Sequence, residues 1–429
     1  QGSLRAQLQQ AAERLRANGD RKTAAVVGGG LSGLACAVEL ASRGFSVLVL
    51  DEMPAGEAAA SACASLLDAL SVKGRVMWRG EEAYAAARSL LDRCATLPAG
   101  ESSGHEGLYL PTTILHVPSS EKQAAQYREA AAESEACSVY LGPDEAVGRV
   151  PVAHLPRGAL LSLHGVVVDS AAYLRALWRL VRSLAPAEWI RQRIGSAHIL
   201  AALFDVVCLA PGAGVRLIDE TRHIPVDLCR GQVLEYEQPC GRGDAATTQE
   251  TELCVAIAGN VYLAPLRGRV VCGATYEPTN DAEQREPPDL DAADKGLRPA
   301  LSVLYPRLAP LAKALGARAG VRALPPRSSS GSLPFAGRAH TSAANVWFIG
   351  GMGARGLLYH AIVARWLVDA ALGKLNSLPL EMRRVEYGCL LQSRLNKVAV
   401  ADPTERSHRG WRSTVEEVDD RGKKEMGGS

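Results

Sequence analysis

The sequence lacks most of the features that mark specialised classes of protein. No run approaches the roughly 18 apolar residues of a transmembrane helix, and no apolar segment typical of a secretory signal opens the chain, so we expect neither. The formal net charge is only +2, which argues against a surface dedicated to nucleic acid. The 10 cysteines show no CxxC or other metal-ligand spacing. We therefore expect no metal site, and reduced, buried thiols as in an intracellular or organellar protein.

What the sequence does contain is enough apolar side chains for a large core. Hydrophobic residues make up 47% of the 429, which suffices for two domains of ordinary size. Residues 1–19 carry Leu and Ala at helical spacing, which predicts an accessory helix before the first strand. Beyond about residue 400 the chain is charged and poor in apolar residues. This composition predicts a disordered tail or, alternatively, a segment that binds a protein partner.

Residues 24–52 form the most informative segment of the chain. An apolar run at 24–27 predicts a buried parallel strand, and a glycine-rich turn, a helical pattern and a second apolar strand at 47–50 follow it directly. This is the order of a βαβ unit whose first turn binds a dinucleotide. Because both strands and the helix are in place, the motif favours dinucleotide binding over a glycine-rich turn without a ligand.

The turn itself has the pattern Gly28-x-Gly30-x-x-Gly33. Gly28 permits the tight turn, Gly30 lets a pyrophosphate approach the backbone, and Gly33 lets the helix pack closely on the strand. The first N–H groups of the helix, which include those of Leu31 and Ser32, and the positive end of the helix dipole are presented to the phosphates. We expect these five residues to bind the cofactor.

Two carboxylates, Asp51 and Glu52, close the unit. Asp51 lies 18 residues after Gly33, at the tip of the second strand, where a carboxylate can accept hydrogen bonds from ribose hydroxyls. The alternative is that the neighbouring Glu52 shares or replaces this role.

Later segments predict further strands and helices. Apolar or alternating runs predict strands at 109–117, 166–168, 204–210, 231–237, 253–265, 269–276 and 346–349. Helical patterns predict helices at 75–96, 120–137, 170–184 and 292–315, and a last helix that ends near residue 372. The last strand leads into a second glycine turn, Gly350-Gly351-Met352-Gly353.

Several motifs recur in the order known from one family. They are the βαβ unit, LLDALSVKGRVMWRG at 66–80, VVCLAPGAG at 206–214, GVRALPPR at 320–327, GSLP at 331–334 and VWFIGGMGARGLLYHA at 346–361. Together they resemble the flavin-dependent amine oxidases of the D-amino-acid oxidase and glycine oxidase type. They are also similar to the oxidase domain of the bacterial bifunctional enzyme that finishes 5-methylaminomethyl-2-thiouridine in tRNA, and most of all to its single-domain relatives in plants, algae and cyanobacteria.

The resemblance implies an α/β fold in which a discontinuous Rossmann-like FAD-binding domain carries an inserted substrate domain with a mixed or antiparallel sheet. The FAD-binding domain would comprise residues 24–75, 155–222 and 325–378, and the substrate domain residues 76–154 and 223–324. A helical extension at 1–23 and a C-terminal extension at 379–429 complete the chain. Relatives in plants and algae suggest a chloroplast location, with a cytoplasmic one as the alternative.

The resemblance also implies non-covalent FAD and assigns its contacts. The segment that wraps the pyrophosphate would include Ser61, Ala64 and Ser65. The adenine and ribose side would be passed by Ala210, Gly212 and Ala213. The pyrimidine end of the flavin would face Gly351, Met352, Gly353, Gly356 and Leu357, where backbone N–H groups and a helix dipole stabilise negative charge.

For the substrate, a small amine, the resemblance points to two side chains that hold a carboxylate. Arg322 matches the family arginine whose guanidinium forms a fork to that group, and Tyr262 matches a tyrosine that donates its hydroxyl. Arg355 lies in the late turn and would face flavin or substrate. Oxidation in this family is hydride transfer from a neutral amine to the flavin in a dry pocket, without an obligatory base, and O2 is the expected electron acceptor.

Two departures from the family pattern leave alternatives open. Asp68-Ala69 stands where close relatives have His-Pro beside the flavin, and the segment between Trp189 and Phe204 is shorter than in relatives. The first hypothesis is an FAD-dependent oxidoreductase for a small amine or amino acid. The second is oxidation of a carboxymethylaminomethyl group on a tRNA base, and the third is a non-catalytic subunit with a flavoprotein fold. His360, on an apolar helix, is interpreted as a core histidine.

Overall fold

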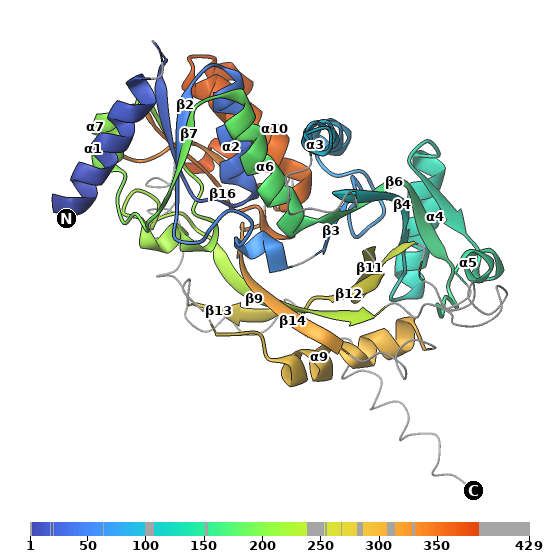
Figure 1. Cartoon of the computed structure of the whole chain (residues 1–429). Helices are drawn as coiled ribbons and strands as arrows, with labels where there is room; N and C mark the ends of the chain where they lie inside the picture. Colours follow the sequence, from blue (N-terminus) through green and yellow to red (C-terminus); the bar gives the residue numbers. More distant parts are fainter. Residues whose placement is uncertain are drawn as a thin grey trace, which may run out of the picture. The chain divides into compact units, whose positions relative to one another are not determined.

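Two β-sheets with flanking helices make up the described part of the chain (Figure 1). The structure is a computed structural model that describes residues 2–17, 19, 21–62, 64–98, 107–150, 153–237, 253, 255–266, 268–280, 286–306, 314–327 and 331–385. The predicted C-terminal tail, with its partner-binding alternative, lies outside these residues. No helix of the described residues is both long and apolar enough to cross a membrane.

The first sheet contains the predicted βαβ unit. Its six strands, in spatial order, are β15 (Phe335–Arg338), β16 (Val346–Gly350), β8 (Val206–Leu209), β1 (Thr23–Val27), β2 (Ser46–Asp51) and β7 (Ala187–Arg191). All neighbours are parallel except the pair β15 and β16. β1 is buried along its whole length because both faces of the sheet are covered. This explains why the strand is an unbroken apolar run rather than an alternating one.

Helices from distant parts of the chain cover the two faces. The helices on one face are α2 (Leu31–Ser42), α3 (Gly80–Ala95), α6 (Ser170–Leu184) and α10 (Gly356–Ala371), and they share one core with the sheet. α1 (Gly2–Ala17), the short α7 (His198–Leu203) and the 3-10 turn η2 (Gly212–Leu217) pack on the other face. In Figure 1, α1 and α7 lie together on the far side of the sheet from α2 and α10.

The accessory helix predicted at the start of the chain is part of the core. Leu8, Ala11, Ala12 and Leu15 of α1 are at most 1% exposed. Arg14 of the same helix forms an ion pair with Glu188 of β7 at 2.6 Å. α1 therefore closes the second face of the first sheet, beside the short connection that follows β7.

The second sheet contains ten strands. Its main path is β13 (Glu277–Thr279), β9 (Asp227–Glu237), β12 (Arg269–Gly273), β11 (Tyr262–Leu266), β10 (Ala256–Ala258), β4 (Tyr109–His116), β6 (Ala159–Asp169) and β3 (Ala64–Leu67). β14 (Ala314–Leu324) also pairs with β9, and β5 (Ser138–Leu141) with β6. The outer helices are α4 (Glu121–Glu133), α5 (Pro143–Arg149) and α9 (Leu290–Leu304).

Short 3-10 turns connect these elements. They are η1 (Ala59–Ala62), η3 (Gly353–Arg355), η4 (Leu375–Ser377) and η5 (Leu380–Val385). η1 lies between β2 and β3, and η3 leads directly into α10. Both are in segments for which the sequence predicts cofactor contacts.

Most predicted elements are confirmed, and two are wrong in extent. The single strand predicted at 253–265 is a pair of antiparallel strands, β10 and β11. The helix predicted at 170–184 has those bounds in the structure, and the strands of the βαβ unit extend the prediction by one residue at an end or both. The helix predicted at 292–315 ends at Leu304 instead, and residues from Ala314 belong to β14. β14 forms a ladder along almost the whole of β9. This pairing decides the structure of a segment whose small residues have little preference of their own.

The strands of the first sheet fall in or next to the segments predicted to bind FAD. β3 and β6, which the sequence also assigned to those segments, lie in the second sheet. The predicted domain boundaries stay a prediction.

Candidate functional site

The turn between β1 and α2 has the steric constraints that the glycine pattern predicts. A Cβ atom on Gly28, whose φ is +105°, would lie 2.2 Å from the carbonyl oxygen of Ala210. A Cβ on Gly33 would lie 1.8 Å from the carbonyl oxygen of Gly28. Both contacts are with backbone atoms, so no side-chain movement could relieve them. Gly28 and Gly33 are therefore required for the turn to form at all.

Gly30 is different because the space in front of it is open. The nearest atom to a Cβ on Gly30 would be Cβ of Ala58, at 3.7 Å. Gly30 is the N-cap of α2, and no side chain caps this helix. In the described residues, no hydrogen bond is donated by the backbone N–H groups of Leu31, Ser32 or Gly33. Free donors at a helix start beside an open backbone fit the pyrophosphate of a dinucleotide.

Asp51 lies against this turn. One carboxylate oxygen accepts a hydrogen bond from the N–H of Gly29 at 2.6 Å, and the other accepts from Met53 at 2.8 Å. Burial raises the pKa of Asp51, although the two backbone donors oppose that shift. Glu52 points elsewhere and pairs with Arg193 at 2.9 Å. The geometry favours Asp51 over Glu52 for the ribose, and the ribose contact itself stays a prediction.

Trp189 of β7 is a neighbour of this turn that the sequence did not reveal. A Cβ on Gly29 would lie 2.2 Å from Cη2 of the indole, and the indole N–H donates to the carbonyl of Met53 at 3.2 Å. Its position depends on β7 pairing with β2, which no local pattern shows. The middle glycine of the GGG run is thus explained by an aromatic ring, not by the cofactor.

Of the other predicted cofactor residues, Ala210 lies against this turn, and Ser61, Ala64 and Ser65 belong to the segment of η1 and β3. The carbonyl of Ser61, in η1, accepts from Arg318 at 2.9 Å, and Ala64 begins β3 opposite Asp169. The hydroxyl of Ser65 contacts that of Ser170 at 2.7 Å. On the opposite side, the N–H of Ala210 donates to Val27 at 2.7 Å. Gly212 and Ala213 follow in η2.

The late glycine turn brings a second helix start to the same place. Gly351 and Gly353 have φ of +65° and +55°, in the left-handed region that favours glycine. Met352 lies between them, and Leu357 is buried in the first turn of α10. A Cβ on Gly356 would lie 3.7 Å from Cδ1 of Leu31. The N-termini of α10 and α2 are therefore adjacent, and each presents the positive end of a helix dipole.

Arg322 lies on β14 between two of these cofactor segments. Gly320, Arg322 and Leu324 project from one face of the strand because side chains alternate. A Cβ on Gly320 would lie 2.6 Å from the carbonyl oxygen of Ala59 in η1, and Cδ2 of Leu324 lies 3.4 Å from a Cβ on Gly353 in the late turn. Arg322 is thus flanked by η1 on one side and by the late turn on the other.

Tyr262 lies on the same face of the second sheet. Arg322 pairs with Cys229, and Tyr262 with Gly273, which in turn pairs with Val233 of β9. Cys229 and Val233 are four residues apart on β9, so all these side chains project to one face. The surrounding residues form an apolar cluster that includes Ile114, Val167, Val233, Ala256, Ala264 and Val271.

Two glycines make room for these side chains. A Cβ on Gly231 would lie 2.8 Å from Nη2 of Arg322, and a Cβ on Gly273 would lie 2.7 Å from Cε1 of Tyr262. The guanidinium of Arg322 and the phenol ring of Tyr262 therefore pack directly against the backbone of these glycines, and a side chain at either position would displace them. Neither glycine belongs to a motif that the sequence analysis used, although Gly231 is the centre of an Arg-Gly-Gln run.

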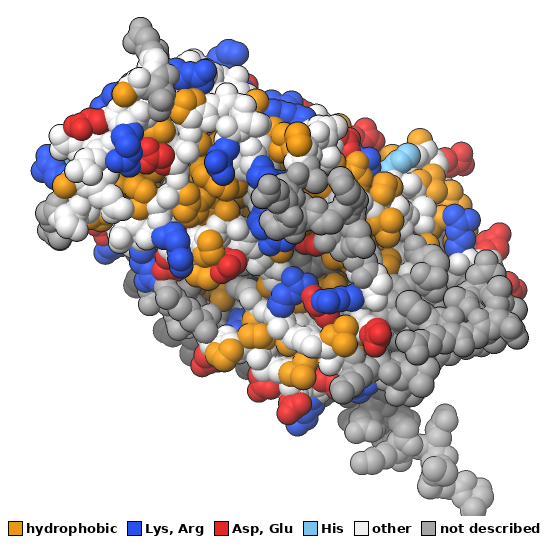
Figure 2. Space-filling view, in the orientation of Figure 1, with side chains coloured by type: hydrophobic (Ala, Val, Ile, Leu, Met, Phe, Trp, Pro, Cys, Tyr) orange, Lys and Arg blue, Asp and Glu red, His pale blue; other side chains and the backbone are white. Residues whose placement is uncertain are grey.

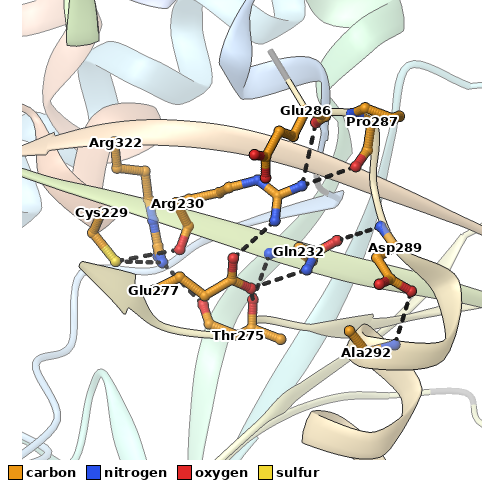
Figure 3. Close-up of polar contacts among 10 residues, drawn as sticks. All are labelled: Cys229, Arg230, Gln232, Thr275, Glu277, Glu286, Pro287, Asp289, Ala292 and Arg322. Carbon is orange, nitrogen blue, oxygen red and sulfur yellow. Dashed lines mark hydrogen bonds and ion pairs between the residues drawn. The ribbon is translucent and has the colours of Figure 1, made fainter. Parts of the chain in front are cut away.

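Among the residues that the structure describes, no carboxylate neutralises the charge of Arg322. Figure 3 shows the side chain reaching across β9, where Nη2 contacts the carbonyl of Thr275 at 3.4 Å and Sγ of Cys229 at 3.8 Å. Within the described residues no Asp or Glu pairs with it. A half-buried guanidinium that has only neutral acceptors can bind an anionic ligand with its planar fork.

Arg355 is in η3, at the start of α10. Its side chain makes no hydrogen bond or ion pair with another residue that the structure describes. Burial raises the pKa of nearby Tyr359, and the positive charge of Arg355 partly opposes this shift. Tyr359 itself donates to the carbonyl of Trp78 at 2.8 Å. The predicted choice between flavin and substrate for Arg355 stays open.

His360 and Asp68 have structural partners. His360 is fully buried, with Nδ1 2.9 Å from the carbonyl of Leu357 and Nε2 2.8 Å from the hydroxyl of Tyr173, so its interpretation as a core histidine is confirmed. Asp68 pairs with His116 at 2.6 Å and accepts from Ser162 at 2.9 Å. Asp68 therefore belongs to a largely buried polar cluster of the second sheet.

Comparison with known proteins points in the same direction as this geometry. A family model described as FAD dependent oxidoreductase matches residues 23–370. The tRNA 5-methylaminomethyl-2-thiouridine biosynthesis bifunctional proteins of Chromobacterium violaceum and Caulobacter sp. are 28% and 27% identical, over 62% and 83% of this chain. The chain covers only 41% and 55% of their lengths, about half of each relative.

Solved structures share the fold. Glycine oxidase from Geobacillus kaustophilus has a TM-score of 0.66 at 19% identity, with 82% of this chain and 95% of that chain covered. Iminodiacetate oxidase from Chelativorans sp. has a TM-score of 0.62 at 19% identity, with 84% and 98% covered. The predicted α/β fold of the D-amino-acid oxidase and glycine oxidase type is therefore confirmed.

Proposed function

Because the chain belongs to the FAD-dependent oxidoreductase family, we propose that it oxidises the C–N bond of a small amine or amino acid that carries a carboxylate. The observation that supports this most strongly is the position of Arg322. On β14 it lies between Gly320, which approaches η1, and Leu324, which approaches the late glycine turn. Its guanidinium packs against Gly231 and has no carboxylate partner in the described residues.

The residues of this face would bind and orient the substrate. The fork of Arg322 would take both carboxylate oxygens, and the hydroxyl of Tyr262 would donate to the same group. The apolar cluster around them would exclude water and favour the neutral amine over the ammonium ion. When bound, FAD would supply the acceptor for the hydride that leaves the α-carbon, and the neutral amine would be left as an iminium ion that water hydrolyses.

The cofactor would be held without a covalent bond, by the free N–H groups of α2, by the start of α10 and by Asp51. Acid precipitation should then leave all flavin in the supernatant. We propose O2 as the electron acceptor, since the names glycine oxidase and iminodiacetate oxidase belong to proteins of the same fold.

A second candidate is oxidation of a carboxymethylaminomethyl group on a tRNA base. The names of the bifunctional relatives favour it. Such a group is also a secondary amine with a carboxylate, so Arg322 and Tyr262 would have the same roles. On the face drawn in Figure 2, however, Lys and Arg side chains are scattered among acidic and apolar ones, which favours a small substrate over an RNA.

Purified holoprotein decides between these substrates. Anaerobic addition of glycine or sarcosine should bleach the flavin absorbance, and undermodified tRNA should not. Arg322→Met should lower kcat/KM for the carboxylated amine at least roughly thirtyfold, as expected when one partner of a buried charge pair is lost. Arg322→Lys should have a smaller effect, because it keeps the charge but loses the fork.

The control is an amine without a carboxylate, for which both variants should resemble the wild type. Equal losses for both amines would assign Arg322 to the fold or the flavin. Bleaching by tRNA alone would support the second candidate, and a flavin that no amine reduces would support a non-catalytic role.

A further inference from the structure

Behind Arg322, on the other face of β9, lies a second arginine with a very different environment. Arg230 is 5% exposed. Its Nη1 pairs with Glu277 of β13 at 2.8 Å, and its Nη2 donates to the carbonyls of Glu286 and Pro287 at 3.3 and 3.1 Å (Figure 3). Arg230 is thus paired with a carboxylate, whereas Arg322 has no such partner in the described part of the chain.

Three side chains donate hydrogen bonds to the carboxylate of Glu277. Its other oxygen accepts from the side-chain amide of Gln232 at 3.0 Å and from the hydroxyl of Thr275 at 2.5 Å. Partial burial raises the pKa of Glu277, but the three hydrogen bonds and the charge of Arg230 outweigh it and hold the pKa below its ordinary value. Glu277 is therefore ionised and fully engaged, and it does not compete for Arg322.

Thr275 connects this cluster to Arg322. Its N–H donates to the carbonyl of Gln232 at 3.0 Å, and its hydroxyl accepts from the N–H of Gln232 at 2.8 Å while donating to Glu277. Thr275 is thus held at three points. Its carbonyl, on the opposite side, is the oxygen that contacts Nη2 of Arg322.

We propose that Thr275 and Glu277 are positioning residues for the substrate carboxylate. Glu277 fixes the Thr275 hydroxyl, the fixed Thr275 carbonyl holds one edge of the Arg322 guanidinium, and the remaining N–H groups are left aimed at the ligand. Arg230 keeps the Glu277 charge paired, so that Arg322 is the arginine of the two whose charge no described carboxylate neutralises. The inference rests on the proposed function, because it concerns the same carboxylate.

Gln232 extends the cluster to α9. Its side-chain oxygen accepts from the N–H of Asp289 at 2.8 Å, and Asp289 caps α9 by accepting from Asp291 and Ala292. The alternative is that the cluster has only a structural role and holds α9 against β9. The two explanations differ in whether a substitution of Thr275 changes the binding of a carboxylate.

The test compares Thr275→Val with Thr275→Ser in the holoenzyme. Acetate binding is measured from the change in the flavin absorption spectrum, and kcat and KM are measured for glycine and for an amine without a carboxylate. Valine has nearly the shape of threonine but no hydroxyl. It should weaken acetate binding and raise KM for glycine about fivefold or more, the factor that one hydrogen bond is worth. Serine keeps the hydroxyl and should stay within about twofold of the wild type.

Tyr236→Phe is the matched control. Tyr236 lies on the same face of β9 as Gln232, and its hydroxyl donates to Asp294 of α9 at 3.1 Å. None of the hydrogen bonds of Thr275 in the described residues involves Tyr236. The proposal expects acetate binding of this variant to be unchanged. If Thr275→Val fails to fold, Glu277→Asp takes its place, because the shorter carboxylate cannot span both Arg230 and Thr275.

Three results would overturn the proposal. Unchanged acetate binding in Thr275→Val, or equal losses for both amines, would leave the cluster with an architectural role only. A loss in Tyr236→Phe as large as in Thr275→Val would do the same. If wild-type holoenzyme binds neither acetate nor glycine, the proposed function fails and this inference fails with it, which separates that case from the others.

Discussion

The dinucleotide turn and the Arg322 face meet at one place but are built in different ways. In the turn after β1, backbone atoms make the contacts, and glycine is needed because a single Cβ would lie about 2 Å from a carbonyl oxygen at Gly28 and at Gly33. On the Arg322 face, side chains make the contacts, and strands far apart in sequence bring them together. A backbone site depends on a short local pattern, whereas a side-chain site depends on strand pairing. A single substitution should therefore abolish the dinucleotide turn, whereas substitutions on the Arg322 face should weaken substrate binding by degrees.

The largest effect should come from Gly33→Ala. Its Cβ would need to displace the carbonyl of Gly28, so we expect the free energy of unfolding to fall by about 4 kcal/mol or more, with FAD binding lost. Gly30→Ala is the control within the same turn, because its Cβ would meet only Cβ of Ala58, at an ordinary contact distance of 3.7 Å. Thermal unfolding of the apoprotein should be near native for Gly30→Ala, while FAD affinity is still lost. Equal stability of the two apoproteins would contradict this account.

Asp68→Asn should have the next largest effect. It replaces the carboxylate oxygen that lies 2.6 Å from Nε2 of His116, in a place where both side chains are 11% exposed. Disrupting a hydrogen bond between buried polar groups costs up to about 3 kcal/mol. Glu133→Gln, which removes an exposed partner of Arg75, should change stability by less than about 1 kcal/mol. Denaturant unfolding measures both, and flavin absorbance of the folded Asp68→Asn protein should be near native.

The burial of His360 predicts that the free energy of unfolding depends on pH. Burial lowers its pKa to about 4 in the folded protein, whereas an unfolded histidine has a pKa of about 6.5. The unfolded state therefore takes up a proton first, and stability is lost as the pH falls from about 6.5 to about 4, by at most about 3 kcal/mol. His360→Gln should flatten this part of the pH profile of thermal unfolding. An unchanged slope in the variant would assign the pH dependence to other groups.

The smallest of these effects should come from Asp51→Ala. Loss of a charge-assisted hydrogen bond to the ribose is worth about 2 kcal/mol, so FAD affinity should fall roughly ten- to a hundredfold with the fold intact. Glu52→Ala should have little effect, because Glu52 pairs with Arg193. Titration of the apoproteins with FAD measures both. If Glu52→Ala lowered FAD affinity more than Asp51→Ala, the carboxylate that binds the ribose would be Glu52 and not Asp51.

The sequence alone determined the first half of the site. The βαβ unit, its glycines and Asp51 lie between residues 23 and 51, and each has a steric or electrostatic reason that can be stated without the fold. The cofactor-binding role of the late turn at 350–353 was inferred from the resemblance to a family. Arg322 and Tyr262 were also named in this way, but nothing in the sequence placed them on one face.

Only the tertiary structure decided which residues surround them. The strand β14 was predicted to begin as a helix, because its small residues have no strong preference until β9 provides a pairing edge. Trp189 contacts Gly29 only because β7 lies next to β2, and Thr275 reaches Arg322 only across the width of β9. A sequence motif specifies local backbone geometry, because each residue constrains its neighbours along the chain. Contacts across strands depend on register, which is set by the burial of whole sheet faces and not by any one segment.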